Sequence, residues 1–246
     1  MKTHNYQSNH GSKFIGSLVG ALVAVVFTLA SISSPATAAQ TDMPLNLTYR
    51  VQLGVKSLGT IEVQLKRNEE LHTIRSVTRP EGIVRLFGGD VVESFDYTPT
   101  GKSWLANSYE EQSERKDKDF TVQFENGAQL TAKLNETMEK FPANSIVEPQ
   151  AFPLAAYYFT DEILDKQKVL IPSRHGIRTY QYDLVGEETL TIDKQSYNAT
   201  KWTRRRIDKD DRWVEIWIDT KSRIPLRIDT VRGDRTVTAE LIENGS

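Results

Sequence analysis

Hydrophobic and polar residues alternate along most of the chain between residues 45 and 243. The alternation is clearest at residues 212–218 and 224–228, where every second residue is apolar. A period of two is typical of half-buried β-strands, because successive side chains point to opposite faces of a sheet. We therefore predict an all-β fold, a mostly antiparallel β-roll or barrel-like sheet of about 12–14 strands, with one buried helix.

The one expected helix covers residues 152–164. Pro153 falls near its first turn, where proline is tolerated, and good helix formers follow. Apolar residues run nearly all the way round this segment, so we expect the helix to be well buried. The preceding residues, 135–150, lose the alternation and are predicted to be loop.

Residues 187–243 predict five antiparallel strands whose register follows from matching apolar faces. We expect the first hairpin to turn at Lys194-Gln195. Opposite charges across a sheet contribute about 0.2–1 kcal/mol per pair, so a row of alternating charge would help to specify the register. The expected pairs are Ile192 with Tyr197, Leu190 with Ala199, Trp202 with Trp217, Arg204 with Glu215, Ile216 with Leu226, Glu215 with Arg227, Ile228 with Ala239 and Arg227 with Glu240.

The composition narrows the classes of function. The formal net charge of the 246-residue chain is −2, which provides no overall positive field, and we expect no nucleic-acid partner. The chain contains no cysteine, which excludes disulfides, thiol catalysis and thiolate metal sites. We expect no metal site and no cofactor.

The N-terminal segment has the features of an export signal. Residues 14–32 are largely apolar, Lys2 and Lys13 precede them, and Ala36-Thr37-Ala38 is a small-x-small cleavage site. We predict a signal peptide at residues 1–38 and a single β-rich domain at residues 39–246, soluble and without a membrane span after cleavage. The alternative is a retained anchor, because about 18 apolar residues can span a bilayer.

Candidate catalytic residues are sparse. Beyond residue 38 the only histidines are His72 and His175, and Ser173 is the serine nearest to either of them in sequence. No nucleophile elbow surrounds Ser173 and His175, and a surface loop is the simpler interpretation. Adjacent acids such as Glu110 and Glu111 point to opposite faces of a strand and form no dyad by spacing. No catalytic residue is assigned.

Three tryptophans are the candidate ligand-binding residues. In the expected register, Trp202, Trp213 and Trp217 lie on the face opposite the apolar stripe of Val214 and Ile216. An aromatic second face either packs on another part of the fold or lines a groove for a ligand. Packing is the commoner of these two arrangements.

Several short motifs follow one another along the chain. They are Tyr49-Arg50-Val51 with Gly54 and Gly59, Phe95-Asp96-Tyr97 before Gly101, the helix after Pro153, Val185-Gly186-Glu187-Glu188, Trp217-Ile218-Asp219 and Arg223-Ile224-Pro225-Leu226-Arg227. Their order and spacing resemble the bacterial family called domain of unknown function 3108. The likeness covers essentially the whole chain after the signal, and it implies an exported, mostly antiparallel β-roll or barrel-like domain of a Gram-negative envelope. It implies no activity, so no functional residue is carried over.

Together these features favour a periplasmic, non-enzymatic module that binds an apolar or amphipathic ligand or maintains the envelope. One alternative is a hydrolase that uses carboxylates or Ser173 and His175. Another is a protein-interaction partner of an envelope assembly. An enclosed apolar cavity would favour ligand binding, a polar cleft with convergent carboxylates would favour an enzyme, and a flat exposed apolar patch would favour a partner protein.

Overall fold

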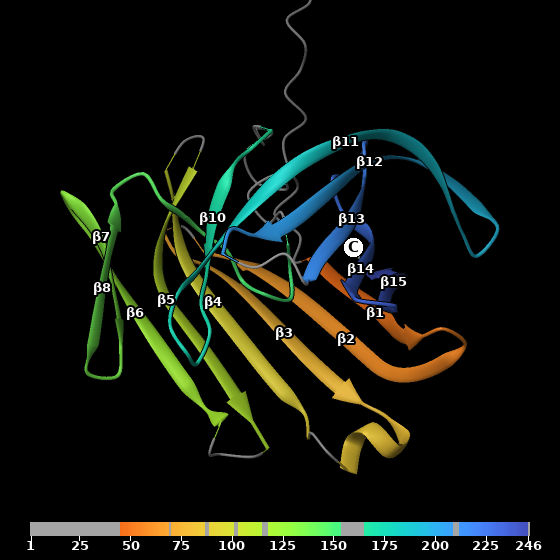
Figure 1. Cartoon of the computed structure of the whole chain (residues 1–246), viewed down its shortest axis with the longest axis horizontal. Helices are drawn as coiled ribbons and strands as arrows, with labels where there is room; N and C mark the ends of the chain where they lie inside the picture. Colours follow the sequence, from red (N-terminus) through yellow and green to blue (C-terminus); the bar gives the residue numbers. More distant parts are fainter. Residues whose placement is uncertain are drawn as a thin grey trace, which may run out of the picture. The chain divides into compact units, whose positions relative to one another are not determined.

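The computed structural model describes residues 45–68, 70–86, 89–100, 103–114, 118–153, 165–208 and 212–245. These residues form fifteen β-strands and one short 3-10 helix, η1 (Gly82–Leu86). Figure 1 shows how the strands are arranged. The prediction of an all-β fold is confirmed. The expected helix is not supported: its first two residues, Phe152 and Pro153, lie in a bend and a turn, and residues 154–164 lie outside the described residues.

All fifteen strands belong to one sheet. Its order is β8-β7-β6-β5-β4-β3-β2-β1-β15-β14-β13-β12-β11-β10-β9, so the first and last strands pair with each other in the middle. The bounds are β1 Leu45–Leu53, β2 Lys56–Arg67, β3 His72–Pro80, β4 Val91–Thr100, β5 Ser103–Ser113, β6 Phe120–Asn126, β7 Gln129–Leu134, β8 Thr137–Pro142, β9 Ile146–Val147, β10 Lys168–Ile171, β11 Arg178–Ile192, β12 Gln195–Arg206, β13 Arg212–Asp219, β14 Pro225–Arg232 and β15 Arg235–Gly245.

The sheet is open, with β8 and β9 as its two edges. The expected barrel-like closure is therefore wrong, whereas the mostly antiparallel pairing is confirmed, since only β9 and β10 run parallel among the described strands. The expected loop at residues 135–150 is also wrong, because β8 and β9 lie there. Neither face of β8 is fully buried, so its sequence lacks the alternation that marks the other strands.

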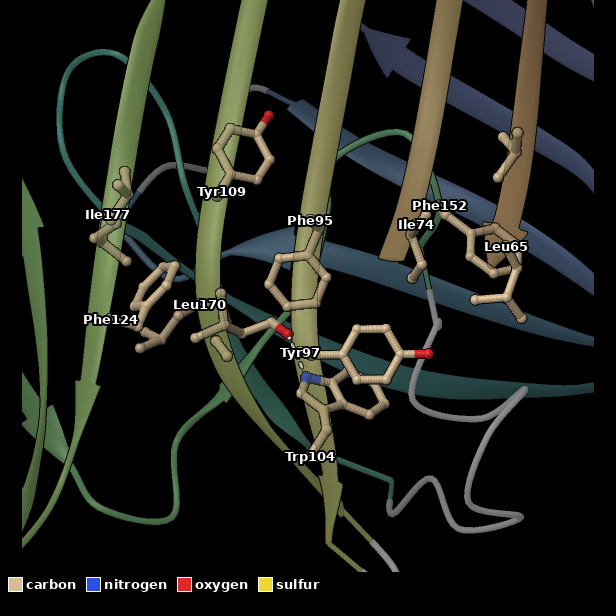
Figure 2. Close-up of a cluster of buried hydrophobic side chains, with 14 of the residues drawn as sticks. Leu65, Ile74, Phe95, Tyr97, Trp104, Tyr109, Phe124, Phe152, Leu170 and Ile177 are labelled. Carbon is tan, nitrogen blue, oxygen red and sulfur yellow. Dashed lines mark hydrogen bonds between the residues drawn. The ribbon is translucent and has the colours of Figure 1, made fainter. Parts of the chain in front are cut away.

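The sheet packs on itself through two main clusters of buried side chains. One cluster gathers apolar residues of β1 to β7 together with Phe152 and Leu170. Figure 2 shows part of it, including Leu65, Phe95 and Tyr109. The other gathers Trp202, Val214, Ile216 and further residues of β10 to β13. Strand β10 contributes to both clusters, because Leu170 belongs to the first while Val169 and Ile171 belong to the second. A short, continuously apolar strand suits burial on both faces.

Two long-range hydrogen bonds join the halves of the chain. The indole Nε1 of Trp104 on β5 donates to the carbonyl oxygen of Val147 on β9 over 2.8 Å (Figure 2). The hydroxyl of Tyr49 on β1 donates to the carbonyl oxygen of Pro225 on β14, also over 2.8 Å. The first bond covers part of an edge strand, whose unpaired backbone groups would otherwise remain available to other chains.

The register of the C-terminal strands agrees with the sequence prediction only in part. Between β14 and β15, Ile228 pairs with Ala239 and Arg227 with Glu240, as expected. The other three pairings are wrong: β11 with β12 and β13 with β14 are each displaced by two residues, and β12 with β13 by one. The observed pairs are Leu190 with Tyr197, Trp202 with Ile216, Arg204 with Val214, Ile216 with Ile228 and Glu215 with Asp229.

The displacement of the β11–β12 hairpin has a local cause. Its turn is Asp193-Lys194 rather than Lys194-Gln195, and both turn residues have positive φ, 44° and 70°. Two successive positive φ angles define the type I′ turn, whose twist matches that of a two-residue hairpin. Between β13 and β14, an irregularity at Trp217 and Ile218 shifts the pairing instead.

No described segment forms a helix with the length and apolarity needed to cross a membrane.

Candidate ligand-binding cavity

A cavity of about 480 Å³ lies between the two halves of the sheet. Small-molecule sites typically enclose roughly 300–1,000 Å³, so the volume suits a ligand. Strands β1 to β5 form one wall, strands β10 to β15 form the other, and residues 150–153 contribute a third side. Its apolar lining includes Val51, Ile61, Val91, Pro153, Ile171, Val214, Ile228, Val237 and Ala239.

Strand alternation explains why apolar side chains gather here. On β13 and β14, Val214 pairs with Thr230 and Ile216 with Ile228, so these side chains share the inner face of the sheet. Ile216 is fully buried in the core, and Val214 and Ile228 continue the same face to the cavity wall. The cavity is therefore an extension of the core in which the two halves of the sheet leave space between them.

Glu93 is a buried acid in the cavity wall, only 5% exposed. Its carboxylate accepts hydrogen bonds from the backbone nitrogens of Gln150 (2.6 Å) and Ala151 (3.0 Å) and from the hydroxyl of Ser76 (3.1 Å). Burial raises the pKa of Glu93, and the two backbone N–H groups offset part of that rise. Glu93 thus fixes the segment leading to Phe152 against β4.

A second carboxylate, that of Glu111, lies directly opposite Glu93 on the paired strand β5 and also lines the cavity. Burial raises the pKa of Glu111, and the negative charge of Glu93 raises it further. The hydroxyl of Tyr109 donates to Glu111 over 3.4 Å. Like charges directly opposite each other destabilise a sheet, so this pair is a feature that packing alone does not explain.

Arg204 on β12 supplies a buried positive charge at the cavity, with 6% of its surface exposed. Its guanidinium carbon lies 5.4 Å from the ring centroid of Tyr180. Burial acts to lower the pKa of Arg204, but Tyr182 and Glu148 outweigh it and hold the pKa above its usual value. Within the described part of the chain, its Nε and Nη1 atoms are buried without a hydrogen-bond partner.

Glu148 is fully buried and accepts a hydrogen bond of 2.6 Å from the hydroxyl of Tyr182. Since Glu148 follows β9 and Tyr182 lies on β11, this bond joins the sheet edge to the strand beside Arg204. The cavity region therefore contains buried charges of both signs, which proteins retain only where partners compensate them.

The structure does not bring the three candidate tryptophans together. Trp202 pairs with Ile216 and belongs to the inner core, on the same face as Val214 and not opposite it as expected. Trp217 lies on the other face of the sheet, in a small cluster with Ala199 and Leu226. Its indole nitrogen donates to Glu188, and Lys201 Nζ lies 4.5 Å from its ring centroid.

Trp213 alone of the three lines the cavity. It is half-buried, and its Nε1 donates to the carboxylate of Glu215 over 3.4 Å. The guanidinium of Arg205 lies 4.9 Å from its ring centroid. Trp213 therefore remains a candidate ligand contact, near the start of strand β13.

The candidate hydrolase residues have other partners. The hydroxyl of Ser173 donates to the carbonyl oxygen of Gly176 over 2.7 Å, and the exposed His175 has its Nε2 atom 3.0 Å from Arg174 Nε. Ser173 Oγ in turn accepts from the backbone nitrogen of His175 over 3.4 Å. His72 is half-buried, with Nδ1 3.3 Å from the hydroxyl of Tyr97, and burial lowers its pKa. These contacts describe a stabilised loop and a sheet contact.

The charged residues of the cavity were missed as site residues, although two of them leave a signal in the sequence. Glu93 occupies the same alternating positions of β4 as the buried Phe95 and Tyr97. Arg204 likewise occupies the positions of the buried Trp202 on β12. A charged residue at a core position of a strand is unusual, and it marks a functional or structural site.

No protein-family model matches this chain, and no curated protein matches it either.

Proposed function

We propose that this protein is an exported, non-enzymatic module that binds an amphipathic small molecule between the two halves of its sheet. The observation that carries the proposal is the cavity of about 480 Å³, whose lining combines apolar side chains with polar and charged ones in about equal measure. Sites for small organic ligands combine apolar contacts with placed polar groups, and a lining of both kinds suits an amphipathic molecule.

The contacts of the candidate catalytic groups favour binding over catalysis. Ser173 and His175 lack the hydrogen bond from serine to histidine that nucleophilic catalysis needs, because Ser173 donates to a backbone carbonyl. Glu93 accepts three hydrogen bonds, two of which anchor the backbone of residues 150 and 151, and this explains its burial as structural support. The apolar lining then serves the hydrocarbon part of a ligand, as burial of apolar surface drives such association.

The test uses Nile red, an uncharged dye whose fluorescence depends on its surroundings, with the chain lacking residues 1–38. Val237 lines the cavity, and Val237→Trp should fill part of it. Val55, which is 97% exposed in a turn, provides the matched control Val55→Trp. We expect saturable binding to the parent protein and the control, weakened about tenfold or more by Val237→Trp while circular dichroism is unchanged. Non-saturable binding, or equal binding by all three proteins, would contradict the proposal.

A second candidate function, a carboxylate-dependent hydrolase, is favoured by one specific observation. Glu93 and Glu111 face each other across β4 and β5, and both line the cavity. A carboxyl group whose pKa is raised can donate a proton to a leaving group near neutral pH. Hydrolysis of a panel of p-nitrophenyl esters and glycosides, abolished by Glu111→Gln, would support this function in place of simple binding.

The proposal that the protein is exported to the periplasm is supported by the sequence of residues 1–38 and by the resemblance described above. The mature chain is then expected to begin within about two residues of Ala39 and to be released by osmotic shock. N-terminal sequencing of the protein from its native cells provides the check. Recovery of Met1 on membrane-bound protein would show that the segment is retained.

A further inference from the structure

We infer that the ligand of the cavity has an anionic head group, a carboxylate or a phosphate, that binds the guanidinium of Arg204. The inference rests on the proposed function and adds the chemical class of the ligand and its orientation. The hydrocarbon part would lie along the apolar walls, and the acid would lie at the inner face of β12.

The first argument is the state of the Arg204 side chain. It lines the cavity, is 6% exposed, and its Nε and Nη1 atoms are buried without a hydrogen-bond partner among the described residues. Buried polar groups are almost always hydrogen-bonded, and an exception calls for an explanation. The guanidinium carries five N–H donors and is never deprotonated in proteins, so an acid with several acceptor oxygens complements it.

The second argument is the contrast with the other arginines nearby. Arg206, on the same face and also at the cavity, forms an ion pair with Asp208. Arg227 forms one with Asp229, at 2.7 Å. Tyr182 and Glu148 lie close enough to Arg204 to raise its pKa. Within the described structure, its Nε and Nη1 atoms nevertheless donate no hydrogen bond. A ligand acid is the group that would use them.

The third argument is the surface beside Arg204. Val214 pairs directly with Arg204, and Ile171 and Ile228 line the same cavity. An anion bound to Arg204 would therefore have apolar wall beside it, the arrangement that an acyl or alkyl chain requires. Glu93 and Glu111 are the negative charges in the cavity wall. The carboxylate of Glu93 is held by three hydrogen-bond donors, and that of Glu111 accepts a hydrogen bond from Tyr109.

The experiment compares four twelve-carbon molecules as competitors of Nile red: dodecanoate, dodecyl phosphate, dodecanol and dodecylamine. We expect one or both acids to bind about ten- to a hundredfold more tightly than dodecanol, the gain typical of a charge-assisted hydrogen bond in a buried site. The ratio of dodecanoate to dodecyl phosphate then identifies which acid the site prefers. These ratios are measured in the parent protein and do not depend on the folding of any variant.

Two arginine variants locate the effect. Arg204→Met should reduce acid binding to the level of dodecanol, because methionine offers no donor to the acid. Removing one member of a buried charged pair destabilises a fold, so urea unfolding first establishes that the variant is folded. Arg205→Met is the matched control, since Arg205 is exposed, lies on the opposite face of β12 and does not line the cavity. It should keep the acid preference of the parent protein.

Each other outcome overturns the inference in a distinct way. If dodecanol binds as tightly as both acids, the head-group inference fails and the proposed function stands. If dodecylamine binds most tightly, the head-group site is the carboxylate pair of Glu93 and Glu111 instead. If the acid preference survives Arg204→Met, the anion binds elsewhere. If no competitor displaces Nile red and the dye itself does not bind saturably, both the inference and the proposed function fail.

Discussion

The ammonium nitrogen of Lys201 on β12 lies 2.9 Å from a carboxylate oxygen of Glu215 on β13. The sequence had paired Glu215 with Arg204 and Arg227 instead. In the structure, Thr203 is directly opposite Glu215, and Lys201 reaches it diagonally across the sheet. Arg227 binds Asp229, two residues further along the same strand, over 2.7 and 2.9 Å. This ion pair is therefore a direct test of the register.

We predict that Lys201 and Glu215 are energetically coupled by about 0.5–1 kcal/mol, the range for ion pairs that remain partly exposed. A double-mutant cycle with Lys201→Met and Glu215→Gln, followed by urea unfolding, measures this coupling. A second cycle with Arg227→Met and Glu215→Gln should give less than half of it. A larger coupling of Glu215 to Arg227 would restore the register expected from the sequence.

The turn between β11 and β12 offers a stabilising substitution. Lys194 has a φ of 70°, in the left-handed region that disfavours residues with a Cβ atom. We predict that Lys194→Gly raises the free energy of unfolding by about 0.5–1 kcal/mol, because glycine adopts this conformation without steric strain.

The neighbouring residue is the control for this prediction. Gln195 is the first residue of β12 and pairs with Ile192. Gln195→Gly should lower the free energy of unfolding, because glycine weakens a strand. Urea unfolding of the two single variants distinguishes the observed turn from the one expected from the sequence. If the hairpin turned at Lys194-Gln195, both substitutions would lie in the turn, and their effects on the free energy of unfolding would not differ in sign.

Glu93 should make the stability of the fold depend on pH. Its pKa is raised above the usual 4.5, mainly by burial, so the folded state binds this proton more tightly than the unfolded chain does. The contribution of Glu93 to stability is then fully present below about pH 4.5 and is lost as the pH rises through the folded-state pKa. We predict that the stability of the parent protein relative to Glu93→Gln is greater at pH 4.5 than at pH 8.

The measurement is urea unfolding of both proteins at half-unit intervals from pH 4.5 to 8. The pKa of Glu111 changes the pH dependence of stability in the same direction. The charge of Glu93 contributes to raising that pKa in the parent protein, and this charge is absent in Glu93→Gln. Glu110→Gln is the matched control, since Glu110 is exposed and adjacent to Glu111 on β5. Parallel stability curves for the parent protein and Glu93→Gln would show that Glu93 keeps an ordinary pKa.

The sequence by itself determined the class of fold and most strand positions. Alternation shows which side of a strand is buried, and that information is local. Both ends of β13 and the start of β14 could therefore be predicted within one residue. The hairpin pairing of Ile228 with Ala239 could be predicted as well, because Gly233 supplies the positive φ, 58°, that its turn needs.

Register elsewhere was decided by tertiary structure, for a physical reason. A slip of two residues keeps every side chain on its own face, so apolar matching cannot distinguish Ile216 opposite Leu226 from Ile216 opposite Ile228. The irregularity near Trp217 and the turn at Asp193-Lys194 fix the register of their hairpins. Neither contains a glycine that would mark it in the sequence. Strand β8, with both faces largely accessible to solvent, gave no periodic signal.

The candidate site depends most on the tertiary structure. Glu93 and Arg204 are far apart in sequence and lie on strands β4 and β12, on opposite sides of the central β1–β15 pair in the strand order. They line one cavity only because the sheet packs its two halves against each other. A local pattern shows that a charged residue occupies a core position, but not which distant residues share its surroundings. The sequence thus determined the strands, and the packing of the sheet on itself decided the cavity, its charges and the separation of Trp202 from Trp217.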